Sequence, residues 1–234
     1  MADTKGIGET PQQQAESYKN LHTKKREWLL PRLAAWAGAI LLGLLYAALP
    51  AHVTVGPSWL PLVVEIVIML ITFSVYLIRR PIFPHTVLRV LNFILLGFVT
   101  LILVVGVSLM IYTLPNRSQT QGGQLLRTAA LLWLSNIIVF ALWYWEIDGG
   151  GPAKRRKSGH QAADFMFPQQ VNGNTEGWAP YFLDYLFVSF TGATALSPTD
   201  TYPLTRIAKL LMMIEAIIAL ISVAIIAGRA VNIL

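Results

Sequence analysis

Five long apolar runs limit what this chain can fold into. They cover residues 29–49, 59–78, 87–114, 125–145 and 204–227. A helix of about 20 mostly apolar residues is long enough to cross the hydrocarbon core of a bilayer. Only 13% of the 234 residues are charged, whereas soluble domains average about 25%. The sequence therefore predicts an all-α integral membrane protein with five transmembrane helices. It excludes a nucleic-acid-binding domain or a long disordered region as the main body.

A sixth apolar stretch, residues 181–196, is shorter than the other five. It contains Asp184 and is followed by Ser197 and Pro198. Its length favours a short re-entrant or interfacial helix before the last span. The alternative is a complete crossing, which gives six spans.

Changes in polarity divide the chain into four regions. We expect a disordered cytoplasmic tail over residues 1–27, a four-helix transmembrane region over 28–148, a polar loop rich in Gly and basic residues over 149–179, and a pore-like helix, hydroxyl-rich turn and last span over 180–234. The three consecutive glycines at 149–151 are expected to end the fourth helix.

The net charge of +6 is unevenly distributed around the predicted spans. Twelve Lys and Arg residues flank one side, among them the run Lys154–Lys157, whereas Arg117 and Arg127 are the two on the other side before the last span. The positive-inside rule then places the N-terminus in the cytoplasm. We interpret Lys154–Lys157 as a topology determinant that is also compatible with anionic lipid headgroups. The aromatic run 143–145 fits an interface anchor.

Catalytic and metal chemistry find little support in the sequence. The chain has no cysteine and four scattered histidines, so thiolate sites are excluded. Asp148, His160 and Asp164 share the polar loop, but their spacing matches no triad or metal pattern. We therefore predict no catalytic, cofactor-binding or metal-binding residues, no enzymatic activity and no nucleic-acid partner.

Ionisable side chains inside apolar segments are rare and need an explanation. Glu215 lies near the middle of the last span, and either an ion-pathway role or a packing role is open for it. Glu65 lies near enough to the start of the second span to reach the interface, which favours packing. Asp184 reads as an anchor at a helix start. Asn136, in the fourth span, is expected to hold helices together by hydrogen bonding.

Small residues in the first span have the spacing that permits close helix approach. They are the pairs Ala34/Gly38 and Ala39/Gly43.

The C-terminal region resembles the pore module of the tetrameric potassium-channel superfamily. Residues 186–190 align with the end of the pore helix, and Thr194 aligns with the first threonine of the filter. Asp200 aligns with the aspartate that follows the filter. Further matches, at the positions of a Pro, a Thr and three charged residues of the family, are Pro203, Thr205, Lys209, Glu215 and Arg229.

The filter itself departs from the family pattern. Ser197 and Thr199 stand where the family has glycines, and Pro198 lies between them. Residues with a Cβ resist the backbone angles that a carbonyl ladder requires, so a potassium-type filter is excluded. The resemblance then implies a homo-tetramer that conducts monovalent ions along hydroxyls and carboxylates. The pathway residues would be Thr191, Thr194, Ser197, Thr199, Asp200 and Glu215. The alternative is a non-conducting membrane scaffold, sensor or complex subunit.

The overall layout is similar to an uncharacterised family of bacterial integral membrane proteins. The shared features are an aromatic-acidic end of the fourth span (143–146), the Gly-rich loop, the element Asp164–Pro168 and the turn 199–201. This resemblance implies the bacterial inner membrane and leaves the activity open.

The pore resemblance and the charge distribution disagree about orientation. Potassium-channel pore loops enter the membrane from outside, which would place the twelve basic residues outside as well. Either the loop enters from the cytoplasm, or residues 181–196 cross completely.

Overall fold

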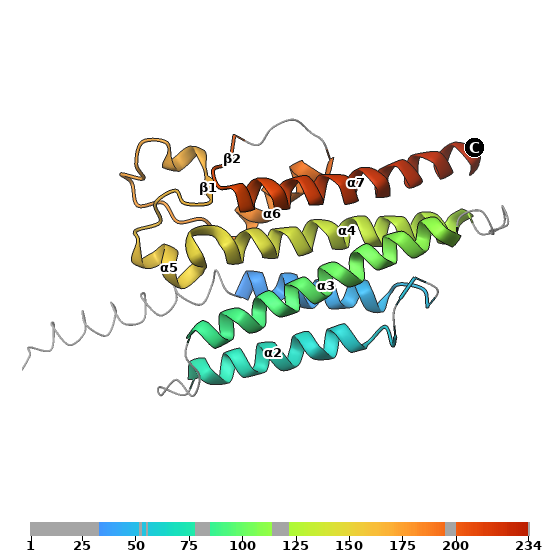
Figure 1. The fold of residues 1–234 in the computed structure, drawn as a ribbon, viewed down its shortest axis with the longest axis horizontal. Coiled ribbons are helices and arrows are strands. Elements are labelled where there is room, and N and C mark those ends of the chain that lie inside the picture. Colours follow the sequence, from blue (N-terminus) through green and yellow to red (C-terminus); the bar gives the residue numbers. More distant parts are fainter. Residues whose placement is uncertain are drawn as a thin grey trace, which may run out of the picture.

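The computed structural model describes residues 33–51, 53–54, 56–77, 85–113, 122–194 and 200–233. Long apolar helices run side by side along its longest axis (Figure 1). They are the helix Leu33–Ala47, α2 (Leu60–Leu77), α3 (His85–Thr113), α4 (Gly122–Ile147) and α7 (Arg206–Ile233). All five predicted apolar segments are therefore helical in their described parts. The tail 1–27 lies outside the described residues.

Three of these helices are long and apolar enough to cross a membrane. The qualifying stretches are Arg89–Thr113, Gly123–Gly150 and Arg206–Gly228. The helix Leu33–Ala47 and the stretch Leu60–Leu70 of α2 are apolar but shorter in the described part of the chain. The prediction of a membrane-compatible helical protein is confirmed at this level, whereas the number of five spans is not.

Helix α4 is the centre of the bundle. Buried residues make up 67% of its apolar window, compared with 22% for α7. Its most extensive contacts are with α7 and with α6 (Phe182–Thr194), and α3 packs against it as well. Figure 1 shows α4 lying between α7 and α3. A polar side chain on α4 is therefore the one best placed to join different helices.

A small polar unit closes one end of the bundle. Helix α4 stops at Ile147, and the next three residues form η3 (Asp148–Gly150). Gly149, Gly150 and Gly151 all have positive φ angles, a conformation that side chains with a Cβ resist, and this confirms that the glycines end the helix. Then follow α5 (Pro152–Lys157), β1 (Phe165–Met166), η4 (Pro168–Gln170) and, after α6, β2 (Tyr202–Pro203). We call residues 148–181 and 200–205 the cap.

Helix α6 leaves the cap, and the chain later returns to it. With 13 residues, α6 is about 20 Å long, shorter than the roughly 30 Å core of a bilayer. Strand β2, which follows α6, pairs antiparallel with β1, which precedes it. Figure 1 shows α6 and the start of α7 next to the cap. The segment 182–205 therefore enters and leaves at one end of the bundle.

Candidate functional site

Glu215 lies at the junction of three helices. Its side chain, on α7, is completely buried, with 0% exposure. The hydroxyl of Tyr144, on α4, donates to Oε2, and the hydroxyl of Ser189, on α6, donates to Oε1. Both carboxyl oxygens are thus satisfied by neighbouring helices, as buried polar groups generally are.

Further contacts tie the same three helices together. Asn136 Nδ2 on α4 donates to the backbone oxygen of Glu215 at 3.2 Å. The Ile137 carbonyl, 2.7 Å from Ser189 Oγ, is a second acceptor within reach of the same single proton. A Cβ at Gly192 would lie 3.3 Å from Glu215 Oε2, so α6 packs closely against the carboxyl. The expected hydrogen-bonding role of Asn136 is confirmed. We call Asn136, Tyr144, Ser189 and Glu215 the Glu215 cluster.

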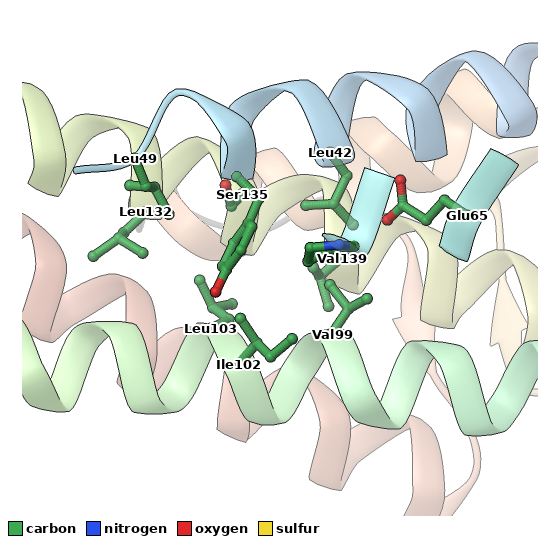
Figure 2. A pocket seen from close by; sticks show the side chains of 11 residues that line it. Leu42, Leu49, Glu65, Val99, Ile102, Leu103, Leu132, Ser135 and Val139 are labelled. Carbon is green, nitrogen blue, oxygen red and sulfur yellow. The ribbon is translucent and has the colours of Figure 1, made fainter. Parts of the chain in front are cut away.

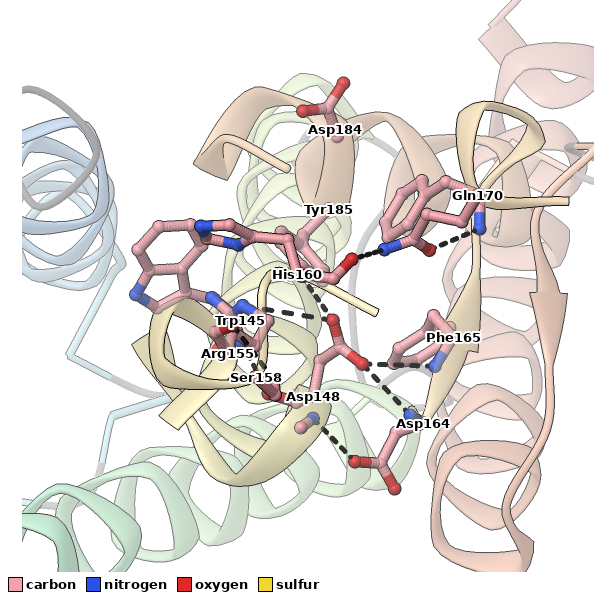
Figure 3. Close-up of polar contacts among 12 residues, drawn as sticks. Trp145, Asp148, Arg155, Ser158, His160, Asp164, Phe165, Gln170, Asp184 and Tyr185 are labelled. Carbon is pink, nitrogen blue, oxygen red and sulfur yellow. Dashed lines mark hydrogen bonds and ion pairs between the residues drawn. The ribbon is translucent and has the colours of Figure 1, made fainter. Parts of the chain in front are cut away.

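A second carboxylate organises the cap. Asp148, 2% exposed, lies just after the end of α4. Its Oδ2 accepts a hydrogen bond from the Tyr185 hydroxyl at 2.5 Å, and its Oδ1 accepts from the backbone N–H groups of Asp164 and Phe165 at 3.0 and 3.2 Å. Figure 3 shows these groups converging on the Asp148 side chain. The first turn of α6 and strand β1 are thereby fixed to the end of α4.

Arg155 supplies the positive charge next to Asp148. Its side chain is 2% exposed, and its Nε lies 3.9 Å from Asp148 Oδ2. Its Nη1 donates to the carbonyls of Trp145 and Asp148, both at 2.7 Å, and the guanidinium lies over the rings of Trp145 and Tyr185. Carbonyls at a helix C-terminus lack helical partners, so Arg155 satisfies the end of α4. Arg155 belongs to the basic run that we interpret as a topology determinant, but its side chain is buried and bonds to the C-terminal end of α4.

Asp164 links the cap to the start of α7. Its Oδ2 accepts from the backbone N–H of Gly149 at 2.9 Å, and its Oδ1 accepts from the Thr205 hydroxyl at 2.7 Å. Its backbone oxygen accepts from the N–H of Leu204 at 2.8 Å. Together, Asp148 and Asp164 join the end of α4 to the starts of α6 and α7.

Burial changes the acid–base properties of the cap. It raises the pKa of the Tyr185 phenol well above its ordinary value; the Arg155 guanidinium opposes the rise and the Asp148 carboxylate adds to it. Tyr185 therefore stays a hydrogen-bond donor. Burial also lowers the pKa of His160, with further lowering by Arg155 and Arg156 and an opposing effect of Asp148.

Most of the predicted pathway residues do not meet at one point. Thr191 and Thr194 donate their hydroxyls to carbonyls one turn earlier in α6. Asp200 is exposed in the cap, and Ser197 and Thr199 lie outside the described residues. None of the hydrogen bonds of Glu215 in the described part of the chain comes from these side chains.

The other two buried or half-buried acids have different surroundings. Asp184 Oδ2 accepts the backbone N–H of Tyr181 at 2.6 Å, which confirms the expected anchor at a helix start. Its carboxyl points away from Asp148 and the groups that bond to it (Figure 3). Burial raises its pKa, an effect that the Tyr181 N–H partly offsets. Glu65 is 5% exposed and lies beside a cavity inside the bundle, and the packing role expected for it stays a prediction.

Sequence reasoning missed the partners of the buried carboxylates. Tyr144 was read as part of an interface anchor, yet it is completely buried. Ser189 had attracted attention only as part of the pore-helix resemblance. The available signal was a polar side chain, such as that of Tyr144, about one turn from the end of an otherwise apolar helix. Its partner, Glu215, lies 71 residues further along the sequence.

Small residues of the first helix approach their neighbours as their spacing suggested. A Cβ at Gly38 would lie 2.8 Å from the ring of Phe182, and one at Gly43 would lie 2.7 Å from Leu62. These glycines therefore allow the helix Leu33–Ala47 to pack closely against α6 and α2.

Three comparisons with known proteins gave no match. The chain matches no protein-family model, no curated protein and no solved structure. Among the residues that the structure describes, no three His, Cys, Asp or Glu side chains are grouped so that they could hold a metal ion. The function must therefore be argued from the geometry of the two clusters and the helices they join.

Proposed function

We propose that the chain is an integral membrane protein with five spans and a re-entrant helix, α6, and that several copies form an ion-conducting pore around the turns after α6. One observation carries the proposal. A helix too short to span leaves the cap and the chain returns to it, between two long antiparallel helices, α4 and α7. This order of span, short helix and span is the arrangement of a pore module.

The positions of the basic residues support a cytoplasmic location for the cap. Described basic residues at that end of the helices include Arg89 at the start of α3 and Arg206 and Lys209 at the start of α7, together with the run 154–157. Arg127 and Arg229 lie toward the other end. Under the positive-inside rule, the re-entrant helix would enter from the cytoplasm, which removes the conflict between charge and pore resemblance. The expected bacterial inner membrane remains part of this proposal.

The outer surfaces of the module suit either lipid or another copy of the chain. Exposed apolar side chains follow one face of α6 and one face of α7: Leu183, Phe187, Phe190, Ile207, Leu210, Met213, Ile217 and Leu220. In a tetramer, the Thr191–Asp200 segments would surround the symmetry axis and offer hydroxyls and the Asp200 carboxylate to monovalent ions.

Flux measurements on the purified protein in liposomes test the pore. We expect passage of a monovalent cation and a clear decrease in the flux for Asp200→Asn. Glu176→Gln is the matched control, because Glu176 is an exposed carboxylate elsewhere in the cap, and it should leave the flux unchanged. Absence of flux for every monovalent ion tried would overturn the proposal.

A second function, a non-conducting scaffold or complex subunit, is favoured by a different observation. The carboxyl of Glu215 has both oxygens satisfied within a single chain, which is what a purely structural junction requires. Mass measurement in detergent or lipid distinguishes the two proposals together with the flux. A tetramer that conducts supports the pore, and a monomer or dimer without flux supports the scaffold.

A further inference from the structure

A small cavity lies in the half of the bundle that α6 and the cap do not reach. It is enclosed by the helix Leu33–Ala47, α2, α3 and α4 (Figure 2). Its volume is about 10 Å³, about the space in which the centre of one water molecule can move. Eight of its eleven lining residues are apolar, and the other three are Tyr46, Glu65 and Ser135. The cavity is thus small and largely apolar.

Glu65 brings a carboxyl group into these surroundings. Glu65 is 95% buried, and its Oε2 has no hydrogen-bond partner among the residues that the structure describes. Figure 2 shows the carboxyl group turned toward Leu42, on the neighbouring helix. A buried polar atom without a partner is unusual in folded proteins. Glu65 therefore differs from the other buried carboxyls, whose oxygens accept hydrogen bonds from described donors.

No described lining residue offers a positive charge to Glu65. The helix Leu33–Ala47 contributes one titratable group, the Tyr46 phenol. The lining residues of α3 are apolar, and the polar one of α4 is Ser135, whose hydroxyl donates to the Leu131 carbonyl at 2.8 Å. An isolated carboxylate in such a site would carry a desolvation penalty of several kcal/mol. The neutral acid carries no such penalty.

The lining also decides between a proton and a larger cation. A metal cation that has lost its water molecules needs a ring of oxygen atoms to replace its hydration shell. Here three of the eleven described lining residues are polar, and the Ser135 hydroxyl is already bonded within its own helix. A proton on the carboxyl needs no such ring of oxygens.

The carboxyl also lies against the backbone of the neighbouring helix. A Cβ at Gly43 would be 2.6 Å from Glu65 Oε2 and 3.0 Å from the Cα of Leu62. Close packing of α2 on the helix Leu33–Ala47 thus holds the Glu65 side chain over Gly43. This contact keeps water from reaching the carboxyl freely.

We propose that Glu65 and its cavity form a proton-binding site, separate from α6 and the turn after it that would line the proposed pore. The bound proton makes the carboxyl neutral, so the group can stay buried without a cation beside it. The site does not depend on ion conduction, so its test is separate from the flux measurement on the pore.

Labelling of the full chain with dicyclohexylcarbodiimide tests this site. The reagent is apolar and reacts with neutral carboxylic acids. The acid proton moves to one nitrogen, the carboxyl oxygen bonds to the central carbon, and acyl transfer to nitrogen then gives a stable acylurea with no leaving group. Peptide mass spectrometry of protein in detergent should find the adduct on Glu65. The yield should fall by about tenfold for each pH unit once the site begins to lose its proton.

Two variants make the result decisive. Glu65→Gln should abolish the adduct while keeping the thermal unfolding midpoint, because glutamine has the shape of the neutral acid. Glu215→Gln should leave the adduct in place, because that carboxyl lies in a different cluster. No adduct on Glu65 at any pH, or a yield that does not change with pH, would overturn the proposal.

Discussion

Two buried glutamates in the helix bundle differ in the groups that surround them. Glu215 accepts hydrogen bonds from α4 and α6 on its two oxygens. Glu65, also buried in apolar surroundings, has an oxygen without a partner in the described part of the chain and a cavity beside it. In the sequence both residues are acids within predicted spans, and the donors around each of them are not visible there. The difference teaches that the surrounding donors, more than the burial, separate a structural carboxyl from one that can take up a ligand.

Asp148 extends this comparison to the cap. It has donors from a tyrosine and two backbone N–H groups, and a buried guanidinium lies next to it. Removing a partner from such a network leaves the others unsatisfied. Glu65 Oε2, by contrast, has no hydrogen-bond partner in the described part of the chain. Stability measurements on variants therefore distinguish the two kinds of carboxyl directly.

The largest effect is expected for Asp148→Leu. The substitution leaves Arg155 as a buried charge without its carboxylate, so we expect a loss of about 3–5 kcal/mol in unfolding free energy. Glu65→Leu should change it by less than about 1 kcal/mol, because an apolar side chain suits the cavity. Denaturant unfolding in detergent micelles measures both. The exposed control Glu176→Leu should be neutral, and similar losses for Asp148→Leu and Glu65→Leu would contradict the comparison.

Glu215→Leu should have the next largest effect. The Tyr144 hydroxyl loses its acceptor, whereas Ser189 keeps the Ile137 carbonyl. We expect a loss of about 1–3 kcal/mol and a smaller one for Glu215→Gln, which keeps an acceptor oxygen. Ser222→Ala is the control on the same helix, since that buried hydroxyl donates to the Ile218 carbonyl of its own helix. Equal stability of the Leu and Gln variants would show that the hydrogen bonds to Glu215 contribute little.

The helices were predictable from the sequence because their signal is local. Runs of apolar residues and the glycines at 149–151 place helix ends within a few residues, and the length of residues 181–196 already indicated a helix too short to span. The polar partners were not predictable. Tyr144 and Glu215 are separated by 71 positions, and nothing in the local sequence specifies which faces of α4 and α7 meet.

The basic run 154–157 illustrates the same limit. Lys154, Arg156 and Lys157 are exposed, as expected for a charged loop, but Arg155 between them is buried against Asp148. The four residues are chemically alike in the sequence. Their different roles follow from the short helix α5, which turns one side chain toward the end of α4 and the others toward the surroundings.

Glycine substitutions probe the two glutamates through their neighbours. Gly43→Ala should lower stability by about 1–2 kcal/mol, because its Cβ meets Glu65 Oε2 at 2.6 Å and the Cα of Leu62 at 3.0 Å. Gly192→Ala should cost less, under about 1 kcal/mol, because its Cβ would make a milder close contact of 3.3 Å with Glu215 Oε2 and the helix gains from alanine. Gly97→Ala, with no atom nearby, is the control and should be neutral or stabilising. Thermal unfolding in micelles ranks the three variants, and a larger loss for Gly192→Ala than for Gly43→Ala would contradict the packing described for the two sites.

The smallest effect is expected for His160, a half-buried residue whose Nδ1 has no hydrogen-bond partner among the described residues. Burial, with help from the guanidinium groups of Arg155 and Arg156, lowers its pKa below the ordinary value of 6.5. Below pH 6.5 the unfolded chain therefore binds more protons at this residue than the folded one, so stability falls as the pH is lowered and is fully present above that value. His160→Asn, which tolerates the positive φ of 54°, should reduce the slope of stability against pH between about 6.5 and 5. Unfolding midpoints of the two proteins across this range measure the difference, and parallel curves would mean that His160 takes up its proton equally well in the folded cap.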